Sequence, residues 1–391
     1  MRLLAKTMEG LEDVLAEEIR SLGGQELQIL KRAVAYTGDK ALLYKSNYLL
    51  RTALKILVFV KEFEIKNEND LYLEIKNFAW EEYFSLEETF AIDSVVNSDM
   101  FRHANFISLK AKDAIVDRYR EKYGARPNVD KDQPTIRINL HVRQNTVTLS
   151  MDSSGRSLHM RGYRLQQTEA PINEVLAAGL ILLSGWDKKT TLIDPMCGSG
   201  TILCEAARIS ANIPPHPENR DFAFSKWRSF DDELWRKIIS DAHNNIVKTE
   251  LPKIMGFDYD SKALDVSKTN IHAAGLTEYI TLEQEDFFYQ EGIEDVMLIF
   301  NPPYDGRLKE DDVTDFYKSI GDKLKLSFPN STAWIISGHI LAMKHLGLRA
   351  SAKKNLLNGS IPSVFCRFDM YKGSKKQKWK ELYKNTSSDE K

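Results

Sequence analysis

The chain has 391 residues, of which 42% are hydrophobic, and a formal net charge of −2. This length suffices for two or three domains. No apolar run could span a bilayer, and the first residues lack the apolar core of a signal peptide. Cys197, Cys204 and Cys366 form neither a metal-type spacing nor an even set, so we expect a protein of the reducing cytoplasm without a metal site.

The first 65 residues alternate between strand-like and helix-like pieces. Leu11, Leu15 and Ile19 recur at helical spacing, and Asp39 is expected to cap a second helix. The pattern predicts strands at residues 2–6, 27–31, 33–37 and 54–65 and helices at residues 10–22 and 39–50. The resulting order β-α-β-β-α-β is that of a ferredoxin-like unit.

A second α/β piece follows, from residue 66 to about residue 155. Residues 135–143 and 146–152 alternate apolar and polar side chains, as a hairpin does, with Asn145 in the turn. The piece is predicted to contain helices at residues 69–78 and 107–123 and strands at residues 90–96, 135–143 and 146–152.

The remaining chain reads as a sheet with helices on both faces. A basic connector at residues 156–164 leads to a helix that begins near Pro171. From residue 191 the alternation of strands and helices predicts a mostly parallel sheet, with an insertion around residues 214–250. Strands are expected at residues 191–194, 254–258, 280–283, 296–300, 333–337 and 364–370. The lysine-rich tail, residues 372–391, is expected to be mobile.

A glycine-containing loop follows the first strand of this sheet. Asp194 ends the strand, Gly198 and Gly200 permit a tight turn, and Thr201 opens a helix. A dinucleotide fold would need a third glycine where Leu203 stands, and a phosphate loop would need Gly-Lys-Ser/Thr. By itself, this loop is as typical of a plain turn as of a ligand site.

Acidic residues follow the next two strands. Asp258 can accept from both ribose hydroxyls of a nucleoside, while Asp260 is expected to cap the next helix. Asp286 can accept from an adenine amino group, with Phe287 packing on the ring. Each acid alone is typical of a solvated loop. Together at successive strand ends they favour an adenosine site with no pyrophosphate, which S-adenosylmethionine fits.

The sequence Asn301-Pro302-Pro303-Tyr304 follows another buried strand. The amino nitrogen of a nucleobase is a poor nucleophile because its lone pair is delocalised into the ring. The Asn301 side-chain oxygen and the Pro302 carbonyl, fixed by the two prolines, are two acceptors that can hold both of its N–H bonds. Tyr304 offers a face for base stacking, worth roughly 1–3 kcal/mol. The loop predicts methyl transfer to an exocyclic amino group, although a proline-stiffened turn alone is common.

With these motifs, nearly the whole chain resembles the class I RNA methyltransferases that carry a THUMP domain. Within that family it is most similar to the N-terminal half of the bacterial bifunctional large-subunit rRNA methyltransferases. The resemblance implies a ferredoxin-like subdomain at residues 1–65, THUMP at residues 66–155 and a Rossmann-like methyltransferase domain at residues 156–371. Its anchors are residues 10–12, 112–117, 126–130, 158–164, 194–201 and 301–304.

The resemblance also implies roles for particular residues. The methionine part of S-adenosylmethionine would lie against Asp194, Cys197, Gly198, Gly200 and Thr201. Asp258 would hold the ribose, and Asp286 and Phe287 the adenine. Residues 171–173, ending at Asn173, would cover the methionine end. The implied product is N2-methylguanosine in 23S rRNA.

Two groups of cations suit phosphate contacts on RNA, although charge runs are by default solvated surface. They are Arg118, Arg120, Lys122 and Arg126 in the second piece, and Arg156, Arg161 and Arg164 in the connector. We expect the first 155 residues to grip folded rRNA or a large-subunit assembly intermediate. Two alternatives stay open: an adenine-N6 methyltransferase acting on RNA or DNA, and a non-catalytic rRNA-binding assembly protein.

Overall fold

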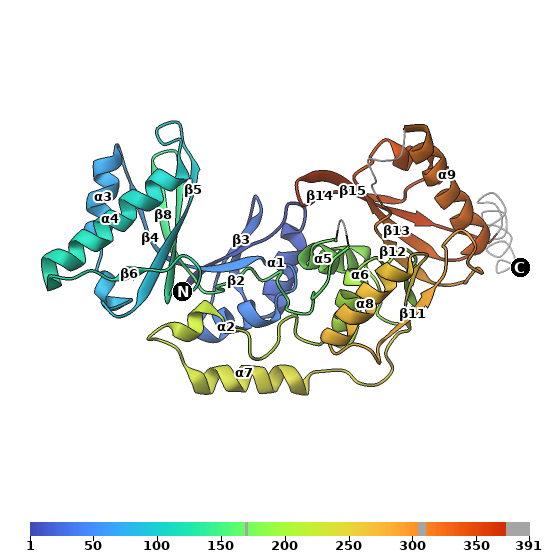
Figure 1. The fold of residues 1–391 in the computed structure, drawn as a ribbon, viewed down its shortest axis with the longest axis horizontal. Coiled ribbons are helices and arrows are strands. Elements are labelled where there is room, and N and C mark those ends of the chain that lie inside the picture. The colour runs from blue at the N-terminus through green and yellow to red at the C-terminus, as the bar shows by residue number, and fades with distance from the viewer. Residues whose placement is uncertain (169–170, 304–309, 373–391) are drawn as a thin grey trace, which may run out of the picture. The chain divides into compact units, whose positions relative to one another are not determined.

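The computed structural model describes residues 1–168, 171–303 and 310–372, with side chains omitted for residues 310–312. The chain forms two compact units (Figure 1). The N-terminal unit contains residues 1–7, 15–160 and 216–244. The C-terminal unit contains residues 8–14, 161–215 and the described residues from 245 onward. No helix in these described ranges is long and apolar enough to cross a membrane.

The N-terminal unit is built on one eight-stranded sheet with the strand order β2-β3-β1-β4-β8-β7-β5-β6. Its first part confirms the ferredoxin-like order, with β1 (Arg2–Lys6), α1 (Glu12–Ser21), β2 (Gln25–Leu30), β3 (Ala33–Thr37), α2 (Lys40–Leu49) and β4 (Lys55–Glu64). Its second part consists of α3 (Glu68–Asn77), η1 (Trp80–Glu82), β5 (Thr89–Asn97), α4 (Ala104–Tyr123), β6 (Asn128–Val129), β7 (Ile136–Arg143) and β8 (Thr146–Asp152). Asp39 caps α2 as predicted, because its Oδ1 accepts the Leu42 N–H at 2.8 Å.

Antiparallel pairing of β4 with β8 makes the two parts one sheet. The register pairs Val58 with Met151. Val58 packs on the core of the first part, and Met151 lies in the core of the second. Because directly paired residues point to the same face of a sheet, both cores lie on one face.

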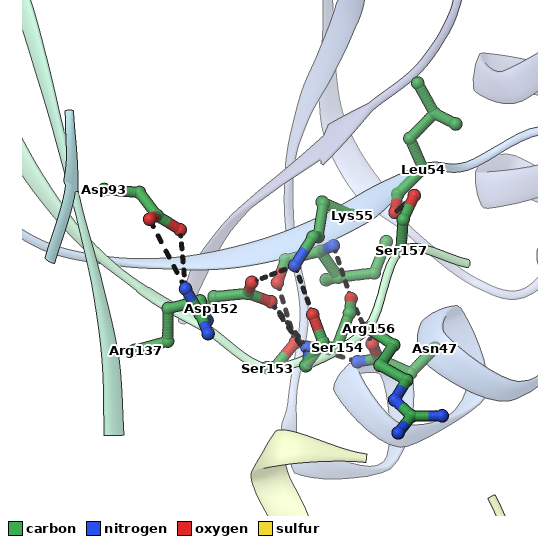
Figure 2. A network of polar contacts seen from close by, with 12 residues as sticks. Asn47, Leu54, Lys55, Asp93, Arg137, Asp152, Ser153, Ser154, Arg156 and Ser157 are labelled. Carbon is green, nitrogen blue, oxygen red and sulfur yellow. Dashed lines mark hydrogen bonds and ion pairs between the residues drawn. The ribbon is translucent and has the colours of Figure 1, made fainter. Parts of the chain in front are cut away.

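A buried polar network fixes the end of β8 to the first part of the unit (Figure 2). Asn47 of α2 donates to Ser153 Oγ at 2.8 Å and accepts from Ser154 Oγ at 2.7 Å. Lys55 of β4 donates to Asp152 and to the carbonyl of Gly155. Each of these polar groups finds a partner, so the chain leaving β8 is held firmly where the connector begins.

Residues 216–244 belong to the N-terminal unit, although they lie within the range expected for the methyltransferase domain. They include η2 (Ala223–Lys226) and α7 (Asp232–Asn244). Phe224 stacks on Tyr44 with ring centroids 4.5 Å apart, and Trp235 packs edge-on against Tyr48 at 5.3 Å. Apolar side chains of the predicted insertion are therefore part of the ferredoxin-like core.

The C-terminal unit is built on a seven-stranded sheet with the order β11-β10-β9-β12-β13-β15-β14. Neighbouring strands from β11 to β13 pair in parallel, and β15 runs antiparallel to β13 and β14. The strands are β9 (Leu192–Asp194), β10 (Ile254–Asp258), β11 (Ile280–Gln284), β12 (Met297–Phe300), β13 (Thr332–Ser337), β14 (Ala352–Asn358) and β15 (Ile361–Asp369). The helices are α5 (Glu174–Ser184), α6 (Thr201–Ser210), α8 (Ser261–Ala273), α9 (Glu310–Ser327) and the 3₁₀ helix η3 (Ala342–Leu346).

The sequence pattern missed strand β14. Lys353, Lys354 and Asn355 are exposed, and only Leu356 of this strand is buried. An edge strand pairs on one side only and needs little apolar patterning, so periodicity gave a weak signal. The doubly wound α/β class predicted for this part of the chain is nevertheless confirmed.

Candidate active site

Three adjacent parallel strands bring the predicted polar residues to one edge of the C-terminal sheet. Asp194 ends β9 and Asp258 ends β10, and the register pairs Asp194 with Gly256. β12 flanks β9 on the other side, and Asn301 follows its last residue. Because neighbouring strands lie about 4.8 Å apart, the polar groups after these strands share one small region.

The glycine loop is fastened to the end of β10. The Cys197 N–H donates to the Phe257 carbonyl at 2.9 Å, and the Gly198 N–H donates to Asp258 Oδ2 at 2.9 Å. Gly198 and Gly200 have φ of 54° and 76°, a left-handed conformation that favours glycine. A side chain at Gly200 would also press on Ser267, since a Cβ there would lie 3.1 Å from its Oγ.

Burial raises the pKa of the two carboxyl groups beneath the loop, Asp194 and Asp258. Burial, with Asp258 as a second cause, raises the pKa of Asp194 to about 8. Burial is also the largest cause of a raised pKa at Asp258, although the N–H groups of Asp260 and Gly198 oppose it. Asp194 accepts the Met196 N–H at 3.2 Å, and its pKa has no lowering contribution from a cation among the described residues. The pair is therefore suited to a ligand that brings positive charge and hydroxyl donors.

Cys197 lies in the loop, but its thiol is not suited to nucleophilic chemistry. The side chain is buried, and burial followed by the charge of Asp194 raises the pKa of the thiol well above its usual range. Since the thiolate is the reactive form, the thiol stays protonated and serves packing. Its sulfur lies 3.8 Å from the hydroxyl oxygen of Ser267.

Arg164 ties the connector to the start of two helices. Its guanidinium donates to the Ile172 carbonyl at 2.5 Å and to Thr201 Oγ1 at 3.0 Å. It also forms an ion pair with Glu174, with Nε and Oε1 3.3 Å apart. Arg164 is thus a scaffold residue of the glycine loop, not the exposed phosphate contact that the sequence suggested.

Asn270 of α8 holds the same segment from the other side, and sequence reasoning missed it. Its Oδ1 accepts the N–H groups of Leu165 and Gln166, and its Nδ2 donates to the carbonyls of Gln166 and Ser199. A detectable signal existed, because Asn270 is a polar residue on the apolar stripe of α8, next to Ile271. Thr168 then lies near Gly198, with its Oγ1 3.8 Å from where a Cβ would stand.

Asn173 and Asp286 have structural roles at the edges of this region. Asn173 caps α5 through its Oδ1, which accepts the Val175 N–H at 2.9 Å. Asp286 follows β11 and accepts the Phe288 N–H at 2.9 Å. Both stay partly exposed, so their predicted cofactor contacts remain sterically open.

Phe287 differs from the expectation. Its ring is 2% exposed and packs in the core of the C-terminal unit, stacked on Phe328 with centroids 5.9 Å apart. The apolar character of this position reflects core packing, so the ring does not offer an open face to an adenine. Periodicity could not separate the two roles, because both need an apolar residue just past the strand.

Asn301 is partly buried, Pro302 is buried and Pro303 is exposed. Register places them beside the end of β13, since Phe300 pairs with Ile335. Tyr304, the expected stacking residue, lies outside the described residues. Convergence of the Asn301 amide and the Pro302 carbonyl on one amino group stays a prediction.

Three of the six arginines predicted to bind RNA are engaged within the protein. Arg161 is fully buried and lies 3.6 Å from Glu205, so it is no surface contact. Arg118 is held by both carboxylate oxygens of Glu81, at 3.0 and 3.1 Å, and by the Lys76 carbonyl. Arg164 is the scaffold residue described above. The remaining three, Arg120, Arg126 and Arg156, are exposed as expected, and Arg120 lies 3.6 Å from Asp117.

Comparison with known proteins agrees with this architecture. Residues 161–366 match the family model described as RMKL-like, methyltransferase domain. Residues 66–152 match the THUMP domain, and residues 2–57 match the RlmL ferredoxin-like domain.

Two relatives are similar to nearly the whole of this chain, and they differ in their own length. A Synechocystis sp. protein with the provisional name RNA methyltransferase slr0064 is 37% identical over 94% of this chain and 96% of its own length. Ribosomal RNA large subunit methyltransferase K/L of Syntrophotalea carbinolica is 33% identical over 95% of this chain, which spans only 54% of that relative.

Solved structures are similar over nearly the whole chain. A protein described as a possible methylase from Clostridium difficile 630 gives a TM-score of 0.87 at 32% identity, covering 96% of this chain and 99% of that one. SMU.472, provisionally a methyltransferase and solved with SAH, gives a TM-score of 0.84 at 29% identity, covering 95% and 99%. The chain therefore belongs to the family of RMKL-like methyltransferases, with a ferredoxin-like domain and a THUMP domain ahead of the methyltransferase domain.

Proposed function

We propose that this chain methylates N2 of a guanosine in large-subunit ribosomal RNA. The family fixes the general reaction as methyl transfer with S-adenosylmethionine as cofactor. The observation that supports the proposal most is the order of strands in the sheet, where β12, which Asn301 follows, pairs in parallel with β9, which ends at Asp194. This order supports an arrangement in which the amino-group acceptor lies near the buried carboxylates.

The residues beside the glycine loop fit this cofactor. When bound, S-adenosylmethionine supplies an electrophilic methyl group on a sulfonium. Asp194, buried without a cation of the protein among the described residues, can accept from the ammonium of the methionine part. Each Asp258 oxygen already accepts one N–H, from Gly198 or Asp260, and each keeps a lone pair for a ribose hydroxyl.

At Asn301 the protein needs only to orient the base amino group. The Asn301 amide oxygen and the Pro302 carbonyl would accept the two N–H bonds of the base amino group and turn the nitrogen lone pair towards the methyl. Alignment of this kind lowers the activation free energy of methyl transfer by several kcal/mol, because the entropy of orienting the reacting atoms is already lost on binding. No strong base is needed, since the nitrogen becomes acidic once it carries the extra methyl.

The relatives support rRNA as the substrate, with one alternative. The K/L relatives are named as ribosomal RNA methyltransferases, but the chain spans about half of their length. A Listeria monocytogenes structure titled as an N6-adenine-specific DNA methylase is 29% identical, with a TM-score of 0.83. Adenine N6 therefore stays the second candidate, since the Asn-Pro-Pro motif serves any exocyclic amino group.

The RNA partner is proposed to bind the N-terminal unit, which carries the THUMP domain. A fragment beginning at residue 165 is a poor test of this idea. It would retain residues 216–244 without the aromatic side chains of α2 against which they pack, and Phe224 and Trp235 would be exposed. Substitutions in the full chain are the better experiment.

Mass spectrometry of rRNA nucleosides from a deletion strain tests the proposal directly. Loss of one N2-methylguanosine from 23S rRNA, restored by the wild-type chain, supports it. Loss of an N6-methyladenosine instead would favour the second candidate. Unchanged nucleosides together with no calorimetric heat on adding S-adenosylmethionine would point to a non-catalytic assembly protein.

Asn301→Ala then tests the assigned residue. We expect turnover to fall by at least about 10³-fold, while the Kd for S-adenosylmethionine changes less than about threefold, because the side chain is assigned to the amino group of the base and not to the cofactor. Thermal unfolding of the variant serves as the folding control. Turnover near the wild-type level would remove Asn301 from the mechanism.

A further inference from the structure

One segment of the C-terminal unit contains basic residues and no acidic residues. Residues 338–368 contain Lys344, Arg349, Lys353, Lys354 and Arg367 but no aspartate or glutamate. The whole chain carries a net charge of −2, so this local excess of positive charge stands out. Such a cluster is the usual electrostatic footprint of a nucleic-acid surface.

The cations of this segment are available to a partner, with one exception. Arg367 is paired with Asp369 at 2.8 Å and is set aside. Lys344, Arg349, Lys353 and Lys354 are exposed. Within the described part of the chain, no carboxylate forms an ion pair with any of these four.

Sheet register links the segment to the Asn301 loop. Phe300 pairs with Ile335, Ile335 with Cys366, and Cys366 with Lys353. Lys353 is therefore three strand spacings from the residue before Asn301, which is about 14 Å. That distance corresponds to roughly two to four nucleotides of extended single-stranded RNA.

Exposed aliphatic side chains lie between the loop and the edge strand. Ile340 and Leu341, which follow β13, are 39% and 72% exposed. Ile361 at the start of β15 is 47% exposed and lies close to Gly338, where an added Cβ would stand 2.8 Å from it. Apolar side chains flanked by cations suit unpaired nucleotides, whose bases and sugars need apolar contact while their phosphates need positive charge.

A buried hydrogen bond holds this apolar surface in place. Ser337 Oγ accepts the His339 N–H at 2.9 Å and lies 2.5 Å from the hydroxyl of Tyr317. Tyr317 belongs to α9, the helix that follows the Asn-Pro-Pro loop in the chain. The turn at residues 338–341 is thereby anchored to that helix.

We propose that residues 338–361 form a second RNA-binding surface, which takes the unpaired nucleotides flanking the target. Lys344, Lys353 and Lys354 contact the phosphates, with Lys353 and Lys354 projecting from opposite faces of the edge strand β14. Ile340 and Leu341 contact the bases or sugars. This inference rests on the proposed function and adds to it an RNA surface on the catalytic domain itself. The competing explanation is that lysines on β14 only protect an edge strand from pairing with other chains.

The test compares two triple variants of the full-length chain. One is Lys344→Gln/Lys353→Gln/Lys354→Gln. The control is Lys188→Gln/Lys253→Gln/Lys318→Gln, which removes the same charge from exposed positions of the same unit. Filter binding to transcribed 23S rRNA at several salt concentrations gives the affinity and its salt dependence for each.

We expect the first triple to lose roughly 10- to 100-fold in affinity near 0.1 M salt and its logarithmic salt slope to fall by about 2, because up to three phosphate contacts disappear. The control should stay within about threefold of wild type. Equal affinity of the two triples would overturn the second surface and leave edge protection as the role of the lysines.

Methylation and cofactor binding separate this inference from the proposed function. With a saturating RNA concentration, the first triple should keep its kcat and its Kd for S-adenosylmethionine, with only KM raised. A wild-type chain that binds 23S rRNA but does not methylate it would refute the proposed function, while the difference between the two triples would still decide the surface. Leu341→Ala should also raise KM, whereas Leu326→Ala, at a leucine exposed on α9, should not.

Discussion

The backbone N–H of Gly198 donates to Asp258 Oδ2 at 2.9 Å. This bond joins the glycine loop after β9 to the carboxylate at the end of β10, so Asp258 both shapes the loop and is the residue proposed to hold the ribose. Asp258→Ala should therefore raise the Kd for S-adenosylmethionine by about 100-fold, the loss of two charge-assisted hydrogen bonds. Calorimetry gives the value. Asp265→Ala, at an exposed residue of α8, is the matched control, and an equal effect there would contradict the argument.

Cofactor affinity should depend on pH through Asp194. Burial, and then Asp258, raises the pKa of this carboxyl to about 8, so it is mostly protonated in the free protein at pH 6 to 7. Pairing with an ammonium requires the carboxylate. Affinity should therefore rise by about tenfold between pH 6 and pH 7, with release of roughly one proton. Titration calorimetry in buffers of different ionisation enthalpy measures that proton. In Asp194→Asn the affinity should be lower and nearly independent of pH, and an unchanged pH dependence would exclude Asp194 as its source.

Asp194 should also make the stability of the cofactor-free protein depend on pH. Cofactor affinity rises with pH, whereas this contribution to stability falls. The pKa of Asp194 is raised in the folded state above the ordinary value near 4. The folded state therefore binds the proton more tightly, and this stabilisation is full below about pH 4 and is lost as pH rises through about 8. Asp194→Asn should lose less free energy of unfolding than wild type between pH 5 and pH 8. Urea unfolding at both pH values tests this, and equal losses would refute it.

Arg164 and Glu174 should be energetically coupled. The Glu174 side chain is 5% exposed, and Arg164 Nε lies 3.3 Å from it. Arg164→Met should cost about 3 kcal/mol because it leaves a buried carboxylate without its partner. It should also weaken cofactor binding, because the hydrogen bonds to Ile172 and Thr201 are lost. Adding Glu174→Gln should recover part of the stability. Urea unfolding of the double-mutant cycle measures the coupling, and additive costs would show that the pair is independent.

Trp235 should matter to RNA binding although it lies within the methyltransferase sequence. Its ring packs in the ferredoxin-like core against Tyr48 and Phe224. Trp235→Ala should cost about 3–5 kcal/mol of unfolding free energy and lower RNA affinity, while cofactor binding persists. Calorimetric unfolding and filter binding test this, with Leu326→Ala as control. Loss of cofactor affinity alone would place α7 with the catalytic unit instead.

Much of the fold followed from local patterns. The ferredoxin-like order was predictable because each element has its own periodicity and its own end signals. Asp39 and Asp260 were expected to cap helices, and both accept a helix N–H, from Leu42 and Lys262. Capping acts within three residues of the chain, so sequence contains it completely. The strand-end acids were predictable for a related reason, since parallel strands bring their carboxyl ends to one edge.

Local patterns were enough to predict most of the elements, their order and the sheet edge to which Asp194, Asp258 and Asn301 belong, although they missed strand β14. Three findings needed the folded chain: Arg161 and Arg164 are held by carboxylates, Phe287 is in the core, and residues 216–244 belong to the N-terminal unit. The reason is physical: periodicity and capping act between near neighbours in the chain, whereas burial and ion pairing depend on groups many residues apart. An arginine that pairs with Glu205 and one that binds a phosphate give the same local sequence signal, so the two roles are distinguished only in the folded protein.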